Sequence, residues 1–354
     1  MDALMNRDVL HVSGELIEQN GSRLRVIHAR AGELIDALIP SLTPALLDTG
    51  GVLLRGFDAL GADGLQRVAA LLGEPLEAYE FGSSPRTHVD KAVFSSTEYP
   101  ASQWIEQHNE QSYTTQWPSR ILFYCETPAT RRGQTPVADS REVYRRLDAS
   151  LRRRFDDRKI MYVRNFGNGL DVPWQQVFGT DDHAAVERFC RARDIGFEWL
   201  DDGEALRTRQ ICQSEWRHPV TGETVWFNQA HLFHVTNLPE DTREALLELV
   251  DEASLPRNTY FGDGTPIDPL MLDEIRAVYR NTTLSFDWHA ADLLILDNVL
   301  MSHGRAPFEG KRRVLVAMAA RRAPTLHLAN ANVCPLPLPF SSNPVPATDR
   351  IFRS

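Results

Sequence analysis

Apolar residues recur along the first part of the chain in two alternating patterns, one typical of buried strands and one typical of helices. Residues 50–57 (GGVLLRGF) form a short apolar run bounded by glycines, which predicts a buried strand. The next segment repeats apolar residues at helical spacing, namely Leu65, Val68, Ala69 and Leu72. Asp63 is the expected N-cap of this helix, and Gly73 is its expected stop. The pattern therefore predicts a strand followed by a helix.

The same alternation continues between residues 120 and 155. Residues 120–124 (RILFY) and 135–138 (TPVA) have the composition of strands. The next helix is expected to open at Asp139–Ser140, because both residue types favour the N-cap position. It would turn four apolar side chains inward, namely Val143, Leu147, Leu151 and Phe155.

The middle of the chain favours helices, and the last structured section returns to strands. Apolar residues at helical spacing occur within residues 185–190, 246–250 and 272–279. Shorter runs typical of strands occur at residues 162–163, 225–227, 293–296 and 314–318. We expect one mixed α/β domain over residues 1–354, in which a helix-rich insertion at about 140–285 separates the strands of one β core. From about residue 324 to 354 the chain is rich in Pro, Asn and Ser, which predicts an extended arm.

Composition and charge limit the classes of function. The 354 residues are 42% hydrophobic and 24% charged, as is typical of a water-soluble globular protein. The formal net charge of −10 argues against general nucleic-acid binding, which relies on cationic surface. No apolar stretch reaches the roughly 20 residues of a membrane-spanning helix, and the start lacks the pattern of a secretory signal. Four scattered cysteines without a CxxC pair favour a reducing compartment, so we expect a cytoplasmic protein.

One segment departs from this acidic average. Between Arg145 and Lys159 the chain holds seven basic residues. A solvated helix face is the simpler interpretation, because runs of charge usually form one. The alternative is a docking patch for an acidic partner.

Residues 107–110 (QHNE) contain the first two candidate metal ligands. On a strand, residues two positions apart project to the same face, so His108 and Glu110 would reach one metal together. An imidazole and a carboxylate form two thirds of the facial triad that suits non-haem Fe(II) oxygenases, because this triad leaves coordination positions open. The pattern H-x-E also recurs by chance, so a third ligand must come from elsewhere in the chain.

The third candidate ligand is His303, which follows the apolar run at residues 293–296. Arg313 comes ten positions later, at the head of another apolar run. This pairing is informative because 2-oxoglutarate chelates iron through its C1 carboxylate and keto oxygen, which leaves its distal carboxylate to be anchored. The planar fork of an arginine suits that carboxylate, and such a charge-assisted pair is strong where water is excluded.

Taken together, these motifs resemble the taurine/2,4-D dioxygenase superfamily. The principal matches are HNE-x-SY from residue 108, DN-x-x-x-x-HGR from residue 297 and RRVLVAM from residue 312. Further matches are STEYP from residue 96, WFNQ from residue 226 and YFGDG from residue 260. The resemblance spans about Val52 to Met318 and is closest to the syringomycin-type branch of amino-acid β-hydroxylases. It implies a double-stranded β-helix, or jelly-roll, core with flanking helices and a helical insertion between the metal-binding strands.

The resemblance implies that His108, Glu110 and His303 are the iron ligands. Many members of the superfamily have Asp where this chain has Glu110, a difference that lengthens the ligand arm by one methylene but keeps the carboxylate. Halogenating relatives lack the carboxylate, which frees a site for halide. Glu110 therefore favours hydroxylation.

Residues that bind 2-oxoglutarate also follow from the resemblance. Thr135, which follows a Gly-x pair, and an arginine before the last apolar strand would bind the distal carboxylate. We prefer Arg313 to its neighbour Arg312 in this role, because adjacent residues of an extended segment point to opposite faces.

Other polar residues admit a structural interpretation. Trp226, Phe227 and Asn228 are candidates for the substrate side of the pocket, and a hydrogen-bonded core amide explains Asn228 equally well. His231 and His234 lie three positions apart, as in a helical metal pair, but a packed or hydrogen-bonded pair is the simpler interpretation.

The implied enzyme is an Fe(II)- and 2-oxoglutarate-dependent dioxygenase that consumes O2 and hydroxylates an unactivated carbon of an amino acid, expected at Cβ. Relatives in this branch act on aminoacyl groups tethered to carrier proteins of non-ribosomal peptide assembly, so the basic segment 145–159 is a candidate docking face. Desaturation, epoxidation, a free small-molecule substrate and the oligomeric state stay open. Two rivals from other classes are a zinc hydrolase with the same three ligands, which gives no role to Thr135 or Arg313, and a catalytically silent binding scaffold.

Overall fold

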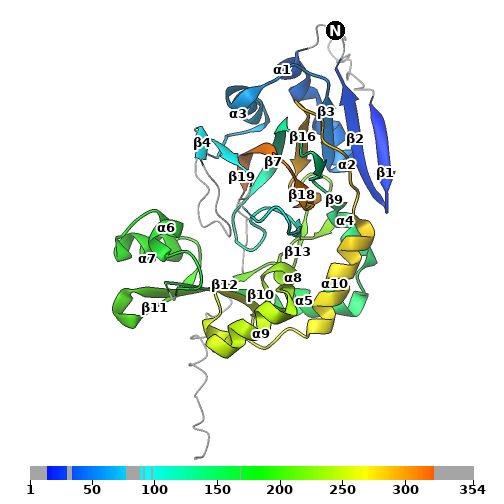
Figure 1. Ribbon diagram of the computed structural model, residues 1–354. Helices are drawn as coiled ribbons and strands as arrows, with labels where there is room; N and C mark the ends of the chain where they lie inside the picture. The colour runs from blue at the N-terminus through cyan, green and yellow to red at the C-terminus, as the bar shows by residue number, and fades with distance from the viewer. Residues whose placement is uncertain are drawn as a thin grey trace, which may run out of the picture. The chain divides into compact units, whose positions relative to one another are not determined.

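A computed structural model describes residues 14–29, 34–76, 88–90, 92–96, 99–167 and 169–322 (Figure 1). The chain divides into two units, Met1–Pro324 and Thr325–Ser354. The predicted arm at about 324–354 lies outside the described residues.

The core of the first unit is an eight-stranded sheet with the order β1-β2-β3-β16-β7-β19-β5-β4. Its neighbouring strands are antiparallel, except that β2 and β3 are parallel. Four predicted runs form four adjacent central strands, which are β3 (Gly51–Arg55), β16 (Leu293–Asp297), β7 (Trp117–Thr127) and β19 (Arg313–Arg322). The outer strands are β1 (Glu15–Gln19), β2 (Ser22–His28), β5 (Val93–Ser95) and β4 (His88–Asp90). Strands from the first and the last part of the described unit therefore lie in one sheet, as the sequence predicted.

Helices cover one face of this sheet. They are α1 (Ile35–Leu38), η1 (Ile39–Ser41), α2 (Thr43–Thr49) and α3 (Gly61–Leu72), and their apolar side chains form one buried cluster with the sheet. The predicted cap of α3 is wrong: the helix begins at Gly61, so Asp63 lies within its first turn. Gly73 ends α3 with φ +151°, and a Cβ atom there would lie 2.7 Å from Cβ of Ala320. Glycine is therefore needed at the end of α3, where the chain passes close to Ala320 of β19.

A three-stranded sheet faces the other side. Its order is β6 (Ile105–His108), β17 (Met301–Arg305) and β9 (Val137–Asp139). Apolar side chains from both sheets share a second buried cluster, to which β9 contributes Val137 and β17 contributes Met301. A short pair, β8 (Arg131–Arg132) and β18 (Phe308–Glu309), adjoins this region. The two sheets thus enclose the space in which the site described below lies.

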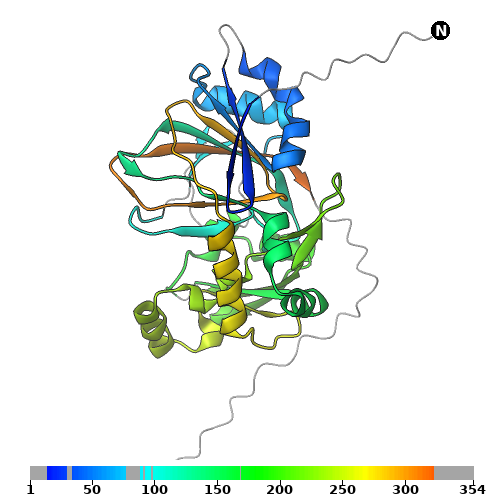
Figure 2. The same ribbon diagram turned by 90° about the vertical axis from the view of Figure 1, so that its right-hand side faces the viewer.

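The residues between β9 and β16 hold most of the helices (Figures 1 and 2). The helices are α4 (Ser140–Arg146), α5 (Ala149–Arg158), α6 (Trp174–Phe178), α7 (His183–Arg191), η2 (Asp201–Gly203), α8 (Ala230–Phe233), η3 (Val235–Asn237), α9 (Glu240–Leu249), η4 (Glu252–Ser254) and α10 (Pro269–Thr282). A four-stranded sheet has the order β11 (Gly196–Leu200), β12 (Ala205–Cys212), β10 (Ile160–Phe166), β15 (Arg257–Phe261), and β13 (Glu215–Arg217) pairs with β14 (Thr224–Trp226). No helix in the described ranges is long and apolar enough to cross a membrane.

The helix predicted from Asp139 is two helices rather than one. Leu147 is extended with ψ 143°, which ends α4, and the side chain of Asp148 caps α5 by accepting from the backbone N–H of Ser150. Asp139 caps α4 as predicted, since its carboxylate accepts from the N–H of Arg141. The four apolar residues expected to face inward are all buried in one cluster. The break changes the direction of the chain without changing which side chains are buried.

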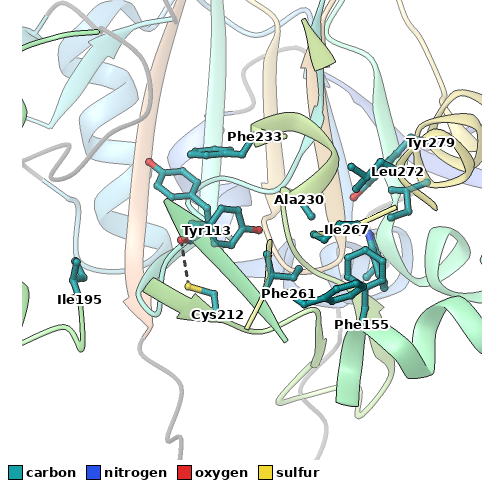
Figure 3. Packing of buried hydrophobic residues seen from close by; sticks show 14 of the residues in the cluster. Tyr113, Phe155, Ile195, Cys212, Ala230, Phe233, Phe261, Ile267, Leu272 and Tyr279 are labelled. Carbon is teal, nitrogen blue, oxygen red and sulfur yellow. Dashed lines mark hydrogen bonds between the residues drawn. The ribbon is translucent and has the colours of Figure 1, made fainter. Parts of the chain in front are cut away.

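This cluster connects the inserted segment to the chain just after β6. Tyr113 packs against Phe233 with ring centroids 4.8 Å apart, and the Sγ of Cys212 donates to the Tyr113 carbonyl at 3.3 Å (Figure 3). Phe155 of α5 packs against Phe261 of β15 at 5.3 Å in the same cluster (Figure 3). The inserted segment therefore supports the loop that carries one of the candidate metal ligands.

Candidate active site

Two histidines and one glutamate converge between the sheets. His108, at the end of β6, lies opposite His303 of β17, with ring centroids 4.4 Å apart. The Oε2 of Glu110 lies 3.7 Å from the Nε2 of His303. One ligand atom from each of the three residues lies within 4.8 Å of the other two. The three side chains are thus close enough to bind one metal ion.

The sequence pattern predicted Glu110 on a strand, but the structure places it outside one. β6 ends at His108, and Glu110 lies in the turn that follows. Its position is set by Asn298, which is fully buried. The Asn298 Oδ1 accepts from the Glu110 N–H at 2.7 Å, and its Nδ2 donates to the Glu110 carbonyl at 3.0 Å and to the Pro118 carbonyl at 2.8 Å. An asparagine side chain therefore holds Glu110 as a strand neighbour would.

Asn109, between the two ligands, extends this network. Its Nδ2 donates to the Asn298 carbonyl at 2.7 Å and to the Ser140 Oγ at 3.0 Å, and its carbonyl accepts from the Gln229 Nε2 at 2.7 Å. Asn109, Gln229 and Asn298 belong to motifs recognised in the sequence, but the motifs did not predict their structural role. The only sequence signal for these residues is an amide side chain within a motif or next to an apolar strand. Such a signal does not identify the residue to which the amide hydrogen-bonds.

Asp297 fixes the turn that carries Asn298. Its Oδ1 accepts from the N–H groups of Val299 and Leu300, at 3.0 and 3.2 Å. Its Oδ2 lies 2.5 Å from the Nη1 of Arg120 and 3.3 Å from the Nε2 of His218. Burial alone would raise the pKa of Asp297, but the hydrogen bond with His218 and the charge of Arg120 lower it. Asp297 is therefore an ionised anchor for the turn.

The tautomer of His108 follows from its backbone contact. The Nδ1 of His108 lies 2.8 Å from the Glu106 carbonyl, which can only accept a hydrogen bond. Nδ1 therefore carries the proton, and Nε2 keeps a lone pair for a metal.

A cavity opens beside the three candidate ligands. It encloses an empty volume of about 380 Å³, which includes open solvent. Its lining comprises both histidines, apolar side chains from both sheets and two arginines, namely Ser96, Ile105, His108, Phe123, Thr135, His303, Gly304, Arg305, Arg312 and Val316. The cavity combines metal-binding groups with a cationic wall.

The structure reverses the preference between the two adjacent arginines. Arg312 lines the cavity, whereas Arg313 points outward, with 60% of its side chain exposed and its Nε 2.7 Å from the Oε2 of Glu126. The reason is alternation along the strand: Arg312 shares a face with Val314 and Val316, whose side chains belong to the cluster between the sheets. Arg312, rather than Arg313, is therefore the candidate for binding a carboxylate.

Thr135 and Arg312 lie together in this wall. The Nη2 of Arg312 donates to the Thr135 Oγ1 at 3.4 Å, and its Nε donates to the Gly133 carbonyl at 2.9 Å. Burial lowers the pKa of Arg312 to about 10, with a further contribution from the nearby charge of Arg305. Arg312 remains a cation at neutral pH, and it forms no ion pair with a carboxylate of the described ranges. Such a buried cation favours an anionic ligand.

The other polar candidates lie away from the cavity wall. Trp226, Phe227 and Asn228 are fully buried and do not line the cavity. Asn228 donates to the Ser214 carbonyl at 2.6 Å and accepts from the N–H of Ala230, so it is a hydrogen-bonded core amide. A role for these three residues toward substrate stays a prediction.

His231 and His234 form hydrogen bonds rather than a metal site. The Nε2 of His231 donates to the Gln107 carbonyl at 3.0 Å, and the Nδ1 of His234 lies 2.9 Å from the Thr236 Oγ1. Burial lowers the pKa of His231 to about 3 and that of His234 to about 4. Both are neutral structural residues at physiological pH.

Two imidazoles and one carboxylate lie beside a pocket whose cation, Arg312, has no ion-pair partner in the described ranges, and together they define a mononuclear metal site of the oxygenase type. The donor set suits iron(II), because it leaves open positions, and Arg312 with Thr135 suits a carboxylate. Residues 20–318 match the family described as "Taurine catabolism dioxygenase TauD, TfdA family". The chain therefore belongs to this family and is an oxygenase that depends on iron(II) and 2-oxoglutarate.

The proteins that are similar to the chain include two curated relatives and the solved structure described next. Over 273 residues it is 39% identical to the dapdiamide synthesis protein DdaC of Enterobacter agglomerans, with 77% of this chain and 83% of DdaC covered. It is 29% identical over 289 residues to a clavaminate synthase-like protein of Arabidopsis thaliana, with 78% and 83% covered. The crystal structure of PvcB from Pseudomonas aeruginosa has a TM-score of 0.51 at 18% identity, with 90% of this chain and 94% of PvcB covered. The last similarity is one of fold.

Proposed function

We propose that the protein is an iron(II)- and 2-oxoglutarate-dependent hydroxylase of an amino acid or amino-acid derivative. His108, Glu110 and His303 would hold the iron, and Arg312 with Thr135 would hold the distal carboxylate of 2-oxoglutarate. One observation carries the proposal: three metal-binding side chains and a buried cation without an ion-pair partner in the described ranges line or adjoin one cavity. The opposed eight-stranded and three-stranded sheets support the further inference that the core is a jelly roll.

When bound, iron(II) together with 2-oxoglutarate supplies the activation of O2 that allows attack on an unreactive C–H bond. The residues of the chain contribute position and exclusion of water. The Glu106 carbonyl orients the His108 ring, and Asn298 fixes Glu110. Phe123 packs against the His303 ring, with centroids 4.9 Å apart. Apolar side chains next to the ligands limit the access of water to the site. A fixed position of the substrate matters as well, because a misplaced substrate would react more slowly.

The relatives support an amino-acid substrate in natural-product biosynthesis. DdaC is named for dapdiamide synthesis, and PvcB is described as an oxygenase from an isonitrile synthetic pathway. A carboxylate at position 110 keeps the third protein ligand and favours hydroxylation over halogenation, and the resemblance to the amino-acid β-hydroxylase branch favours Cβ as the position. Desaturation and epoxidation use the same centre, and product analysis separates the three outcomes.

The basic segment offers less free charge than its sequence suggests. Glu142 pairs with Arg145 and Arg146, and Asp263 pairs with Arg158. Within the described ranges, Arg153 and Arg154 are exposed and form no ion pair. Any carrier-docking role of segment 145–159 would therefore depend mainly on these two residues.

Charge reversal tests this role. If an acidic carrier protein docks on α5, Arg153→Glu with Arg154→Glu should weaken turnover of a carrier-tethered substrate and leave turnover of the free amino acid unchanged. Arg188→Glu with Arg191→Glu on α7 makes the same change of charge on another exposed helix face and is the matched control. Equal loss on both substrates, or on neither, would refute docking at α5.

The cofactor assignment is tested by anaerobic titration of the metal-free protein with Fe(II) and 2-oxoglutarate, followed through the visible charge-transfer absorption of the chelate. We expect absorption in the wild type, its loss in His303→Ala, and a requirement for far more 2-oxoglutarate in Arg312→Gln. Arg313→Gln is the matched control and should behave like the wild type. Bound metal without the absorption would favour a zinc hydrolase, and no bound metal would favour a binding scaffold.

A further inference from the structure

The hydroxyl of Thr135 has two donors directed at it. Its Oγ1 accepts from the indole Nε1 of Trp288 at 3.1 Å and from the Nη2 of Arg312 at 3.4 Å. Indole and guanidinium nitrogens only donate hydrogen bonds, so both interactions have a fixed direction. A hydroxyl oxygen that accepts twice has only its own proton left to give. Thr135 lines the cavity, and no acceptor for that proton lies among the described side chains and backbone groups.

We propose that Trp288 is a positioning residue that makes the Thr135 hydroxyl a dedicated donor to the distal carboxylate of 2-oxoglutarate, an inference that rests on the proposed function. Thr135 and Arg312 would then present two donors to one carboxylate. Trp288 does not line the cavity, so it would act through Thr135 rather than by contact with the ligand.

The surroundings of Trp288 suit this role. The residue follows α10 and precedes β16, and its side chain is 7% exposed within the cluster between the sheets. Its ring packs edge-on against Phe286, with centroids 4.9 Å apart. A packed indole holds its N–H in one direction, whereas a threonine hydroxyl rotates freely when nothing constrains it. Without the indole donor, only the longer contact from Arg312 would orient the Thr135 proton.

Trp288→Phe removes the donor and keeps an aromatic ring in the cluster. We expect it to weaken binding of 2-oxoglutarate about tenfold, as loss of one well-directed hydrogen bond to a charged group does. Binding of 2-oxopentanoate, which lacks the distal carboxylate, should not change. Trp174→Phe is the matched control, because Trp174 is also buried, lies outside the cavity lining and has an indole N–H without a hydrogen-bond partner in the described ranges.

The measurement is calorimetric titration of the anaerobic Fe(II)-loaded protein with each oxo acid, after thermal unfolding has shown that the variants are folded. A double-mutant cycle with Thr135→Val gives the sharper test. If Trp288 acts through Thr135, Trp288→Phe should have no further effect in the Thr135→Val background. Wild-type affinity in Trp288→Phe, or additive losses in the double variant, would overturn the positioning role while leaving the proposed function intact. Failure of the wild type to bind 2-oxoglutarate would overturn both.

Discussion

Asn298→Ala should separate the stability of the fold from the positioning of Glu110. The substitution removes three hydrogen bonds and leaves the Glu110 N–H and the carbonyls of Glu110 and Pro118 without their partner. All three hydrogen bonds are made by a side chain that is fully buried. The perturbation therefore acts on the backbone of a candidate metal ligand without touching a ligand atom.

The expected magnitude follows from these contacts. Each buried polar group that loses its partner costs about 1–3 kcal/mol, and water that enters the vacated space offsets part of this cost. We expect the free energy of unfolding to fall by about 3 kcal/mol in the metal-free protein. Affinity for Fe(II) should fall by about 10- to 100-fold, as for other residues that orient metal ligands.

Asn165→Ala provides a matched control on β10. Asn165 is also buried and also makes three side-chain hydrogen bonds, to the carbonyls of Ala253 and Leu255 and from the Nε of Arg207. Its loss should cost similar stability but leave the affinity for Fe(II) unchanged. Urea unfolding of the metal-free proteins gives the first quantity, and anaerobic Fe(II) titration below the unfolding transition gives the second. Equal Fe(II) affinity in the two variants would refute the view that Asn298 positions Glu110.

Two further predictions concern pH and a buried ion pair. Because burial lowers the pKa of His231 to about 3 and of His234 to about 4, the unfolded chain binds more protons below pH about 6.5, and stability should fall with decreasing pH. At pH 5 each buried neutral histidine should lower the free energy of unfolding by about 2 kcal/mol. The difference in unfolding free energy between pH 7 and pH 5 should therefore shrink by that amount in His231→Gln or His234→Asn. An unchanged difference would contradict the view that these histidines are buried in the neutral form. Asp292→Asn, which breaks the buried 2.7 Å pair with Arg55, should lower the unfolding free energy by about 3 kcal/mol in urea titration. Asp36→Asn breaks an exposed pair and should cost less than about 1 kcal/mol; equal losses would refute the role of burial.

The sequence predicted the strands of the large sheet because their apolar runs are short and bounded by turn residues. It favoured Arg313, whereas Arg312 lines the cavity, because both faces of β19 are apolar and the pattern does not mark the cavity side. Val314 and Val316 face the cavity side, whereas Leu315 packs with the helices on the other face. Alternation predicts that the two arginines diverge but not which face holds the cavity. That information comes from the partner sheet, whose strands are distant in sequence.

The candidate metal ligands illustrate the same limit. The sequence identified His108, Glu110 and His303, and the structure brings them together, although for Glu110 the geometric reason differs from the one expected. The spacing H-x-E reads as a strand pattern, yet the turn at Glu110 depends on an asparagine that is 188 residues away. Trp226 was a candidate for the pocket wall but is fully buried in the core. The sequence could not distinguish the two positions, because an apolar run looks the same in a pocket wall and in a closed core.

The long separation between Glu110 and Asn298 has a consequence for the biosynthesis of the protein. β6 pairs with β17, so neither the third ligand nor the support for Glu110 exists until nearly all of the described chain has left the ribosome. Pairings between such distant segments form late and slowly, because the loop between them must close first. A chain that ends before Asn298 would offer His108 and a Glu110 without its support, and would hold iron weakly. Tight iron binding is therefore expected only after these distant segments have paired.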